Sequence, residues 1–218
     1  MRIENNVLVI RPAETSLKIS DVAEKIISGI MDTEELDIVG VSNGIYLACA
    51  SINMAKDISN VNINGIFLDY IDVPLLGKIE AISCRLVKKP EINYKELVAN
   101  EEKDMHLTSD REGQLISVGG GTALDKLLTI SLIKLSKTDK LKIIGAGRAI
   151  SDAVSLSLKL AKGQISKDSI GIDLIDLYSI EARGDPSKKT SAISIYLKKG
   201  CTTQYSKWHT DLIRKIKS

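Results

Sequence analysis

The sequence predicts an α+β protein built from two modules, each a two-layer unit with the element order β-α-β-α-β-β. The main observation is an internal repeat, in which residues 36–57 lie over residues 141–162 at a constant offset of 105. The matched residues are Leu36, Ile38, Gly40, Ile45 and Ala48 on Leu141, Ile143, Gly145, Ile150 and Ala153. The flanking elements follow the same order in both halves, so the repeat indicates two copies of one small domain.

The first half contains two apolar helices between four strands. A helix is expected over residues 21–31, capped by Ser20 or Asp21, with Val22, Ile26, Ile27 and Ile30 on one face. A second helix over about 45–55 follows the turn Ser42-Asn43-Gly44. Strands are expected at 7–11, 36–41, 66–73 and 79–87, the last two joined by a short hairpin at Val73–Lys78.

The second half repeats this order. A strand at 114–118 leads through Gly119-Gly120-Gly121 into a helix that ends near Leu135, and Thr122 with Asp125 resembles a capping box. A strand at 141–144 and a helix at about 149–161 follow. Strands at 170–180 and 192–197 enclose a hairpin tip at 183–189, and residues 208–217 predict a short basic helix.

We expect module boundaries at 1–89 and 113–218, the second module including the C-terminal helical tail. Residues 90–112 between them are acidic and polar and begin with Pro90, as is typical of a linker, and a short helix over 94–99 is an option.

Composition indicates a globular protein with an aliphatic core, since 44% of the 218 residues are hydrophobic and only 4% are aromatic. No apolar run approaches the ~18–20 residues of a membrane span, and the N-terminus resembles a first strand more than a signal peptide. Cys49, Cys84 and Cys201 have no paired spacing, which argues against a disulfide framework or a zinc site. We therefore expect a cytoplasmic protein without membrane partners, cofactors or metals.

The two halves differ in charge although the whole chain has a net charge of +2. Residues 1–89 carry nine Lys and Arg against twelve Asp and Glu, and residues 90–112 carry three against seven. Residues 113–218 carry eighteen against nine, a net of +9. Such asymmetry is typical of a protein with an anionic partner, although a solvated lysine-rich surface gives the same composition.

The run Ile143–Val154 resembles the Alba family of archaeal nucleic-acid-binding proteins, in which a GRAIS-like sequence follows the second strand and opens the second helix. Gly147–Ser151 reproduces that sequence, and the order of elements over 114–199 matches as well. The resemblance extends to residues 6–89 only through the internal repeat and the order of elements. The resemblance implies a tandem protein whose two copies form an intramolecular pseudo-dimer. It also implies binding of double-stranded DNA or RNA, pairing with Alba-family proteins or with a second copy, and a nucleoid-associated location.

The chain departs from the family at contact positions. Gly120 and Gly121 stand where the family has two lysines, and Asn43 occupies the first copy's position equivalent to Arg148. The first copy's hairpin also has one lysine, so a two-armed clamp is not expected. The nucleic-acid-binding residues that we expect are Arg148, Arg183, Lys188, Lys189, Lys142 and Lys126. Arg148 opens a helix whose N–H groups attract anions, and hairpin lysines contact phosphates without reading sequence.

Several alternatives remain open. Arg148 can pair with Asp152, and the hairpin lysines can be merely solvated. Trp208 can stack on a base or pin the terminal helix, which is the more frequent role. Gly119–Thr122 can cradle a phosphate or form a plain turn. No catalytic constellation stands out, because His106 and His209 lie far apart in the chain. We predict a non-enzymatic protein that binds nucleic acid weakly, or alternatively a protein-interaction scaffold that pairs with Alba-like proteins.

Overall fold

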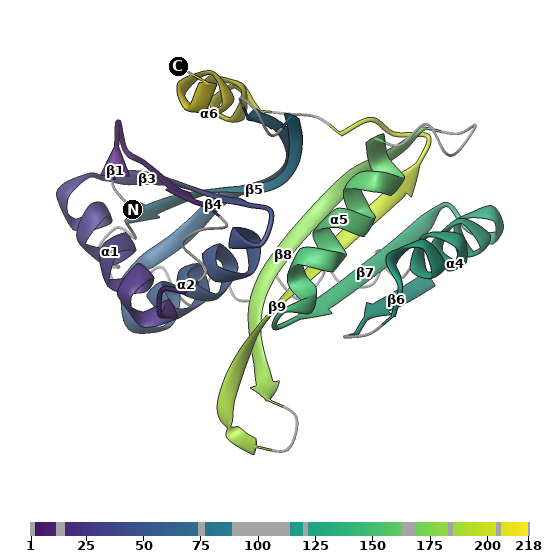
Figure 1. The fold of residues 1–218 in the computed structure, drawn as a ribbon, viewed down its shortest axis with the longest axis horizontal. Coiled ribbons are helices and arrows are strands. Elements are labelled where there is room, and N and C mark those ends of the chain that lie inside the picture. Colours follow the sequence, from purple (N-terminus) through teal and green to yellow (C-terminus); the bar gives the residue numbers. More distant parts are fainter. Residues whose placement is uncertain are drawn as a thin grey trace, which may run out of the picture.

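A computed structural model describes residues 3–11, 16–73, 77–88, 114–119, 122–162, 169–182, 185–203 and 206–217. These residues form a mixed α+β structure of two sheets and five helices (Figure 1). The first half contains β1 (Ile3–Glu4), β2 (Val7–Ile10), α1 (Ile19–Asp32), β3 (Glu35–Val41), α2 (Gly44–Ile58), β4 (Val61–Val73) and β5 (Gly77–Lys88). The second contains β6 (Gln114–Val118), α4 (Leu124–Lys137), β7 (Lys140–Ala146), α5 (Ala149–Lys162), β8 (Ile170–Ala182), β9 (Asp185–Lys199) and α6 (Lys207–Lys217).

The two sheets have the same topology. The first has the order β1-β2-β3-β5-β4 and the second β6-β7-β9-β8, so the second matches the first without β1. In each, the first two equivalent strands are parallel and the others antiparallel. Both hairpins also carry a β-bulge at the same place, at Asn64 in β4 and at Asp173 in β8. The element order expected from the sequence is therefore confirmed in both halves.

A steric requirement explains why glycine recurs at positions 40 and 145, each opposite an alanine. A Cβ atom on Gly40 would lie 2.6 Å from the Ala48 Cβ, and one on Gly145 would lie 2.7 Å from the Ala153 Cβ. Only glycine opposite alanine lets the central strand approach the second helix so closely in each half. The turn between them is also shared, because Ser42 and Gly147 both adopt a positive φ, of 49° and 55°.

The halves pack against each other through α2, α5, β4 and β8, which lie in the middle of Figure 1. The aliphatic side chains between sheets and helices form a single buried cluster with members from both halves. The buried Asn53 side chain on α2 donates a hydrogen bond of 2.9 Å to the Tyr178 carbonyl oxygen on β8. Lys162 on α5 forms an ion pair with Asp69 on β4. The interface between the two halves therefore combines apolar packing with a hydrogen bond and an ion pair.

Helix α6 crosses back to the first half and covers the outer face of its sheet, opposite α1 and α2 (Figure 1). Leu212 is buried there in a cluster with Val7, Val39, Val41, Ile71 and Ala81. The Trp208 ring meets the Phe67 ring edge to face, with centroids 5.4 Å apart. The prediction that Trp208 pins a terminal helix is thus confirmed. The outer face of the first sheet is covered, whereas no described helix covers the outer face of the second.

Some sequence expectations about strands are corrected. Strand β4 begins at Val61 and not at residue 66, because the bulge at Asn64 interrupts the alternation of apolar side chains. Strand β9 begins at Asp185, so Lys188 and Lys189 lie within a strand and not in a tip loop. Strand β1 was not expected. It pairs with β2 across Asn5 and Asn6, which both have a positive φ and form a two-residue hairpin turn.

The expected helix caps are also wrong. Helix α1 begins after Lys18, and neither Ser20 nor Asp21 caps it. Helix α4 begins after Ala123, whose position makes no side-chain cap, so the capping box of Thr122 and Asp125 is not formed. Asp21 and Asp125 still lie in the first turns of their helices, where a carboxylate interacts favourably with the helix dipole. The expected linker at 90–112 lies outside the described residues, and the module boundaries stay a prediction.

Candidate nucleic-acid interface

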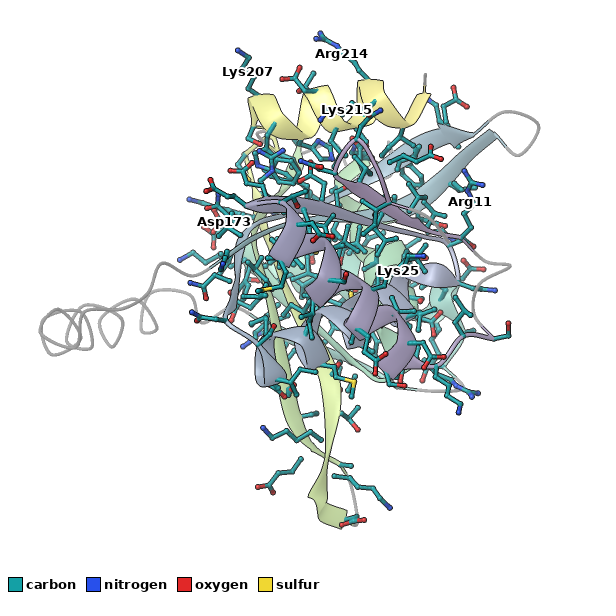
Figure 2. All side chains as sticks on the ribbon, turned by 90° about the vertical axis from the view of Figure 1, so that its left-hand side faces the viewer. Arg11, Lys25, Asp173, Lys207, Arg214 and Lys215 are labelled. Atoms are coloured by element: carbon teal, nitrogen blue, oxygen red, sulfur yellow. The ribbon has the colours of Figure 1, made fainter. Side chains whose placement is uncertain are left out.

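The β8–β9 hairpin extends well beyond the body of the protein as an arm, which both views show (Figures 1 and 2). Lys188 and Lys189 lie on this arm with side chains 76% and 69% exposed. Lys188 pairs with Asp185 at 3.0 Å, and Lys189 lies 3.7 Å from Asp57 of the first half. Exposed pairs of this kind contribute little and are screened by salt, so both amines stay accessible to an anion. Arg183 lies outside the described residues.

The turn that carries Arg148 lies at the base of this arm. The Gly147 backbone N–H donates a hydrogen bond of 2.9 Å to the Ser191 carbonyl oxygen on β9, which ties the turn to the arm. Arg148 follows in an exposed position and immediately precedes the first turn of α5. Within the described part of the chain it forms no ion pair with Asp152, so the alternative of a helix-start pair is not supported. An exposed guanidinium beside free helix N–H groups favours an anion.

Lys126 belongs to the same edge of the second half. It is exposed in the first turn of α4, and β6 and β7 are parallel, so α4 and α5 begin at the same edge of the sheet. Arg148, Lys126 and the arm lysines thus form a basic edge around the carboxyl ends of these two strands. Gly120 and Gly121, which replace the family's lysines, lie outside the described residues.

Lys142 lies apart from this edge, contrary to its grouping with the other five residues. It alternates with the buried Leu141 and Ile143 along β7 and therefore points to the outer face of the second sheet. Its ammonium lies 5.0 Å from the centroid of the Tyr196 ring on β9. Hydrogen bonding to Tyr196 raises the pKa of Lys142, with burial opposing and Tyr178 and Asp176 adding smaller contributions. Lys142 therefore does not belong to the basic edge formed by Arg148, Lys126 and the arm lysines.

The first half has a hairpin of comparable extent but opposite character. Strands β4 and β5 pair as far as Val73 and Gly77, in agreement with the connection expected at 73–78. The hairpin is longer than expected because β4 begins at Val61. It carries Asp69, Asp72 and Glu80 with one lysine, Lys78, and Asn43 stands at the position equivalent to Arg148. The expectation of a single basic arm agrees with these residues.

Two cysteines and His209 are buried in the packed interior. Cys49 and Cys84 are buried as expected, and burial raises the pKa of Cys49 to about 12 and that of Cys84 well above its usual value. His209, in the first turn of α6, is buried and stacks on the Phe67 ring. Burial lowers the pKa of His209, while Asp69 raises it and Lys162 lowers it further. No group of three or more metal-ligating side chains occurs among the described residues.

A pocket of about 530 Å³ lies between the two edge strands β4 and β8. Both bulge residues, Asn64 and Asp173, line it, together with Asp176 and Lys56. The Lys56 amine donates to the Leu177 carbonyl oxygen at 3.5 Å. Two carboxylates and one engaged lysine do not suit a phosphate, so we do not assign nucleic-acid binding to this pocket.

No family model matches the chain, and no curated protein matches it in sequence. Among solved structures, Alba from Thermoplasma volcanium is similar at 21% identity with a TM-score of 0.32. The similarity covers 39% of this chain and 99% of that chain. The function is argued below from the residues of this chain. Among the described helices, none has the length and apolar character needed to cross a membrane.

Proposed function

We propose that this chain is a non-enzymatic nucleic-acid-binding protein that binds duplex DNA or RNA weakly and without sequence preference. The observation that carries this proposal is the basic arm with Arg148 at its base. A two-stranded hairpin that projects from the body can lie along a groove, and its lysines contact phosphates on either side. Arg148 and Lys126 add contacts where the arm meets the body.

We also propose that the two halves act as an intramolecular pseudo-dimer of Alba type in the cytoplasm, with nucleoid association. The identical strand order and bulge positions and the interface through α2 and α5 support this arrangement. In such a pair only the second half presents a basic arm. The chain therefore holds one side of a duplex and does not enclose it, which agrees with weak binding.

The test is a fluorescence-anisotropy titration with short DNA and RNA duplexes at roughly 50 and 200 mM salt. The four described basic residues of this edge would neutralise about four phosphates, which gives a slope of log affinity against log salt near −3.6. Affinity should then fall about 150-fold over this range of salt. The charge reversal Lys188→Glu with Lys189→Glu should weaken binding and reduce the slope by about two.

A matched control is Lys18→Glu with Lys88→Glu, which makes the same change of net charge at two exposed lysines of the first half. We expect this control to bind nearly as the unmodified protein does. Equal loss in both double variants would show that net charge, and not the arm, governs binding. Absence of duplex binding even at low salt would refute the proposal.

A protein-interaction scaffold is the second candidate, favoured by the acidic character of the first half's hairpin. Asp72 and Glu80 on that hairpin suit a basic partner, such as an Alba-like protein. Under this alternative the duplexes do not bind, and a mixture with an Alba protein elutes as a complex in size-exclusion chromatography. Separate elution at low salt would exclude it.

A further inference from the structure

No described helix covers the outer face of the second sheet. The strand registers define it: residues opposite one another in antiparallel strands share a face. On this face Lys142 opposes Tyr196, Lys140 opposes Lys198, and Ile144 opposes Ser194. From β8, Leu174 lies next to Tyr196 and Tyr178 next to Ala192. The Tyr178 hydroxyl lies 2.9 Å from the Ser194 hydroxyl, which confirms that both point outward.

The first sheet shows what the equivalent positions hold when the face is covered. Glu35 and Asp37 stand at the places of Lys140 and Lys142, and Arg85 stands at the place of Tyr196. Arg85 donates two hydrogen bonds to the Asp37 carboxylate, at 2.8 and 2.9 Å, and lies 3.2 Å from Glu35. The Trp208 ring of α6 covers Arg85, with the guanidinium carbon 4.8 Å from the ring centroid. Two acids of the covered face are therefore replaced by two lysines on the open face, and Arg85 is replaced by an uncharged tyrosine.

Charge disfavours a second copy's α6 as the partner of the open face. Helix α6 carries Lys207, Arg214, Lys215 and Lys217 against one acid, Asp211, and Figure 2 shows Lys207 and Arg214 pointing away from the body. Its contact with Arg85, which Glu35 and Asp37 hold, is made by the Trp208 ring. The open face has Tyr196 in place of that arginine, so a basic helix gains no equivalent contact beside its lysines. Lys140, Lys142 and Lys198 favour an anionic partner.

The shape and polarity of the open face do not suit a helix. The covered face receives α6 on Val9, Phe67 and Ile79, whose equivalents on the open face are Ser117, Asp176 and Thr190. Three apolar contacts are thus replaced by polar side chains, whereas Leu115 and Ile180, at the places of Val7 and Ile71, stay apolar and exposed. An amphipathic helix would therefore bury less apolar area here than α6 buries on the first sheet. A flat sheet with aromatic rings beside lysines instead suits stacked bases with phosphates alongside.

We propose that the outer face of the second sheet binds single-stranded nucleic acid, with bases stacked on Tyr196 and Tyr178 and phosphates held by Lys140, Lys142 and Lys198. This inference extends the proposed function, because it assigns single strands to a face distinct from the arm that contacts duplexes. Tyr196 is half-buried, and the Lys142 ammonium lies 5.0 Å from its ring centroid, so an aromatic ring and a cation are held together on this face. Stacking on such a ring tolerates any base, which keeps the binding independent of sequence.

The experiment compares one short oligonucleotide as a single strand and as a duplex, by fluorescence anisotropy at low salt. The variant Tyr196→Leu should weaken binding of the single strand by about tenfold, whereas Tyr196→Phe, which keeps the ring, should bind normally. Neither change should alter duplex binding. The arm variant Lys188→Glu with Lys189→Glu should show the opposite pattern. Ultraviolet crosslinking of a bromouridine-containing single strand should give an adduct on the peptide that contains Tyr196.

The outcomes separate this inference from the proposed function. Duplex binding without single-strand binding overturns the inference and leaves the arm proposal intact. Equal losses for Tyr196→Leu and Tyr196→Phe, with native circular dichroism, overturn the stacking role. Poly-glutamate of equal charge that competes as well as the single strand overturns the assignment to nucleic acid, because lysine charge alone would then explain binding. Selective loss in Tyr196→Leu together with the crosslink supports it.

Discussion

Replacing Leu212 by Ala should detach α6 from the first sheet. Leu212 is 1% exposed and is the central side chain of α6 in the cluster on the outer face of that sheet. Its neighbours Val39 and Val41 belong to a central strand and cannot move to fill the space. Only α6 can adjust, because it is a terminal helix of 11 residues and too short to be stable alone in water.

The expected loss in free energy of unfolding is about 2 to 3 kcal/mol, toward the lower end of the ~2–5 kcal/mol found for buried Leu→Ala changes. The lower end applies because a helix at the end of the chain relaxes more than an internal one. The loss also has an upper limit, since it cannot exceed the free energy with which α6 docks on the sheet. Any cost beyond that value is avoided when the helix leaves the sheet.

The chain contains a single tryptophan, Trp208, so intrinsic fluorescence reports the docking of α6 directly. Leu212→Ala should shift the emission to longer wavelength as the indole becomes hydrated, and urea titration should give the loss of stability. Arg214→Ala is the control, because that side chain is 76% exposed, and it should change stability by less than about 0.5 kcal/mol. An unshifted emission together with a similarly small change in Leu212→Ala would refute this account of α6.

Two further predictions concern the interior. Burial lowers the pKa of His209 below its usual 6.5, so the unfolded chain binds a proton more readily than the folded one; stability should be full above about pH 6.5 and fall below it. Urea midpoints between about pH 5 and 7.5 should show this slope, which His209→Phe should reduce, and an equal slope in both proteins would contradict it. Gly145→Ala should cost about 1–3 kcal/mol, because the added Cβ would lie 2.6 Å from the Ala149 carbonyl oxygen. Gly119→Ala, which meets nothing within 4 Å, should be nearly neutral in the same titration, and similar effects of the two changes would argue against the close contact of strand and helix.

The sequence predicted the order and type of the elements because aliphatic periodicity is strong in both halves. The repeat was visible because Gly40 and Gly145 must each face an alanine on the following helix. Element ends were less well predicted, since bulges and hairpins depend on pairing. The bulge at Asn64 shifts the alternation of side chains by one residue, so a period of two no longer identifies the first part of β4.

The candidate site was predicted in part. Arg148, Lys126 and the arm lysines lie along one edge of the second sheet because β6 and β7 end there, which the element order implied. The separation of Lys142 from them could have been seen in its alternation with Leu141 and Ile143. The position of Tyr196 beside Lys142 could not have been seen, because it depends on the register of β9 against β7. Nor does local sequence show that α6 returns to the first sheet, since that choice rests on contacts between distant segments.

The two outer faces can differ because both halves belong to one chain. In a symmetric dimer of identical subunits, equivalent positions carry identical residues, so a tail that covers one sheet covers the other as well. Here Asp37 and Lys142 occupy equivalent positions with opposite charge, and α6 is the one described helix that covers an outer face. It packs on the acidic sheet, and no described helix covers the lysine-bearing sheet. If Asp37→Lys with Glu35→Lys weakens α6 docking, as the single tryptophan would report, then charge selects the covered sheet. An unchanged emission would assign that choice to the apolar contacts of α6.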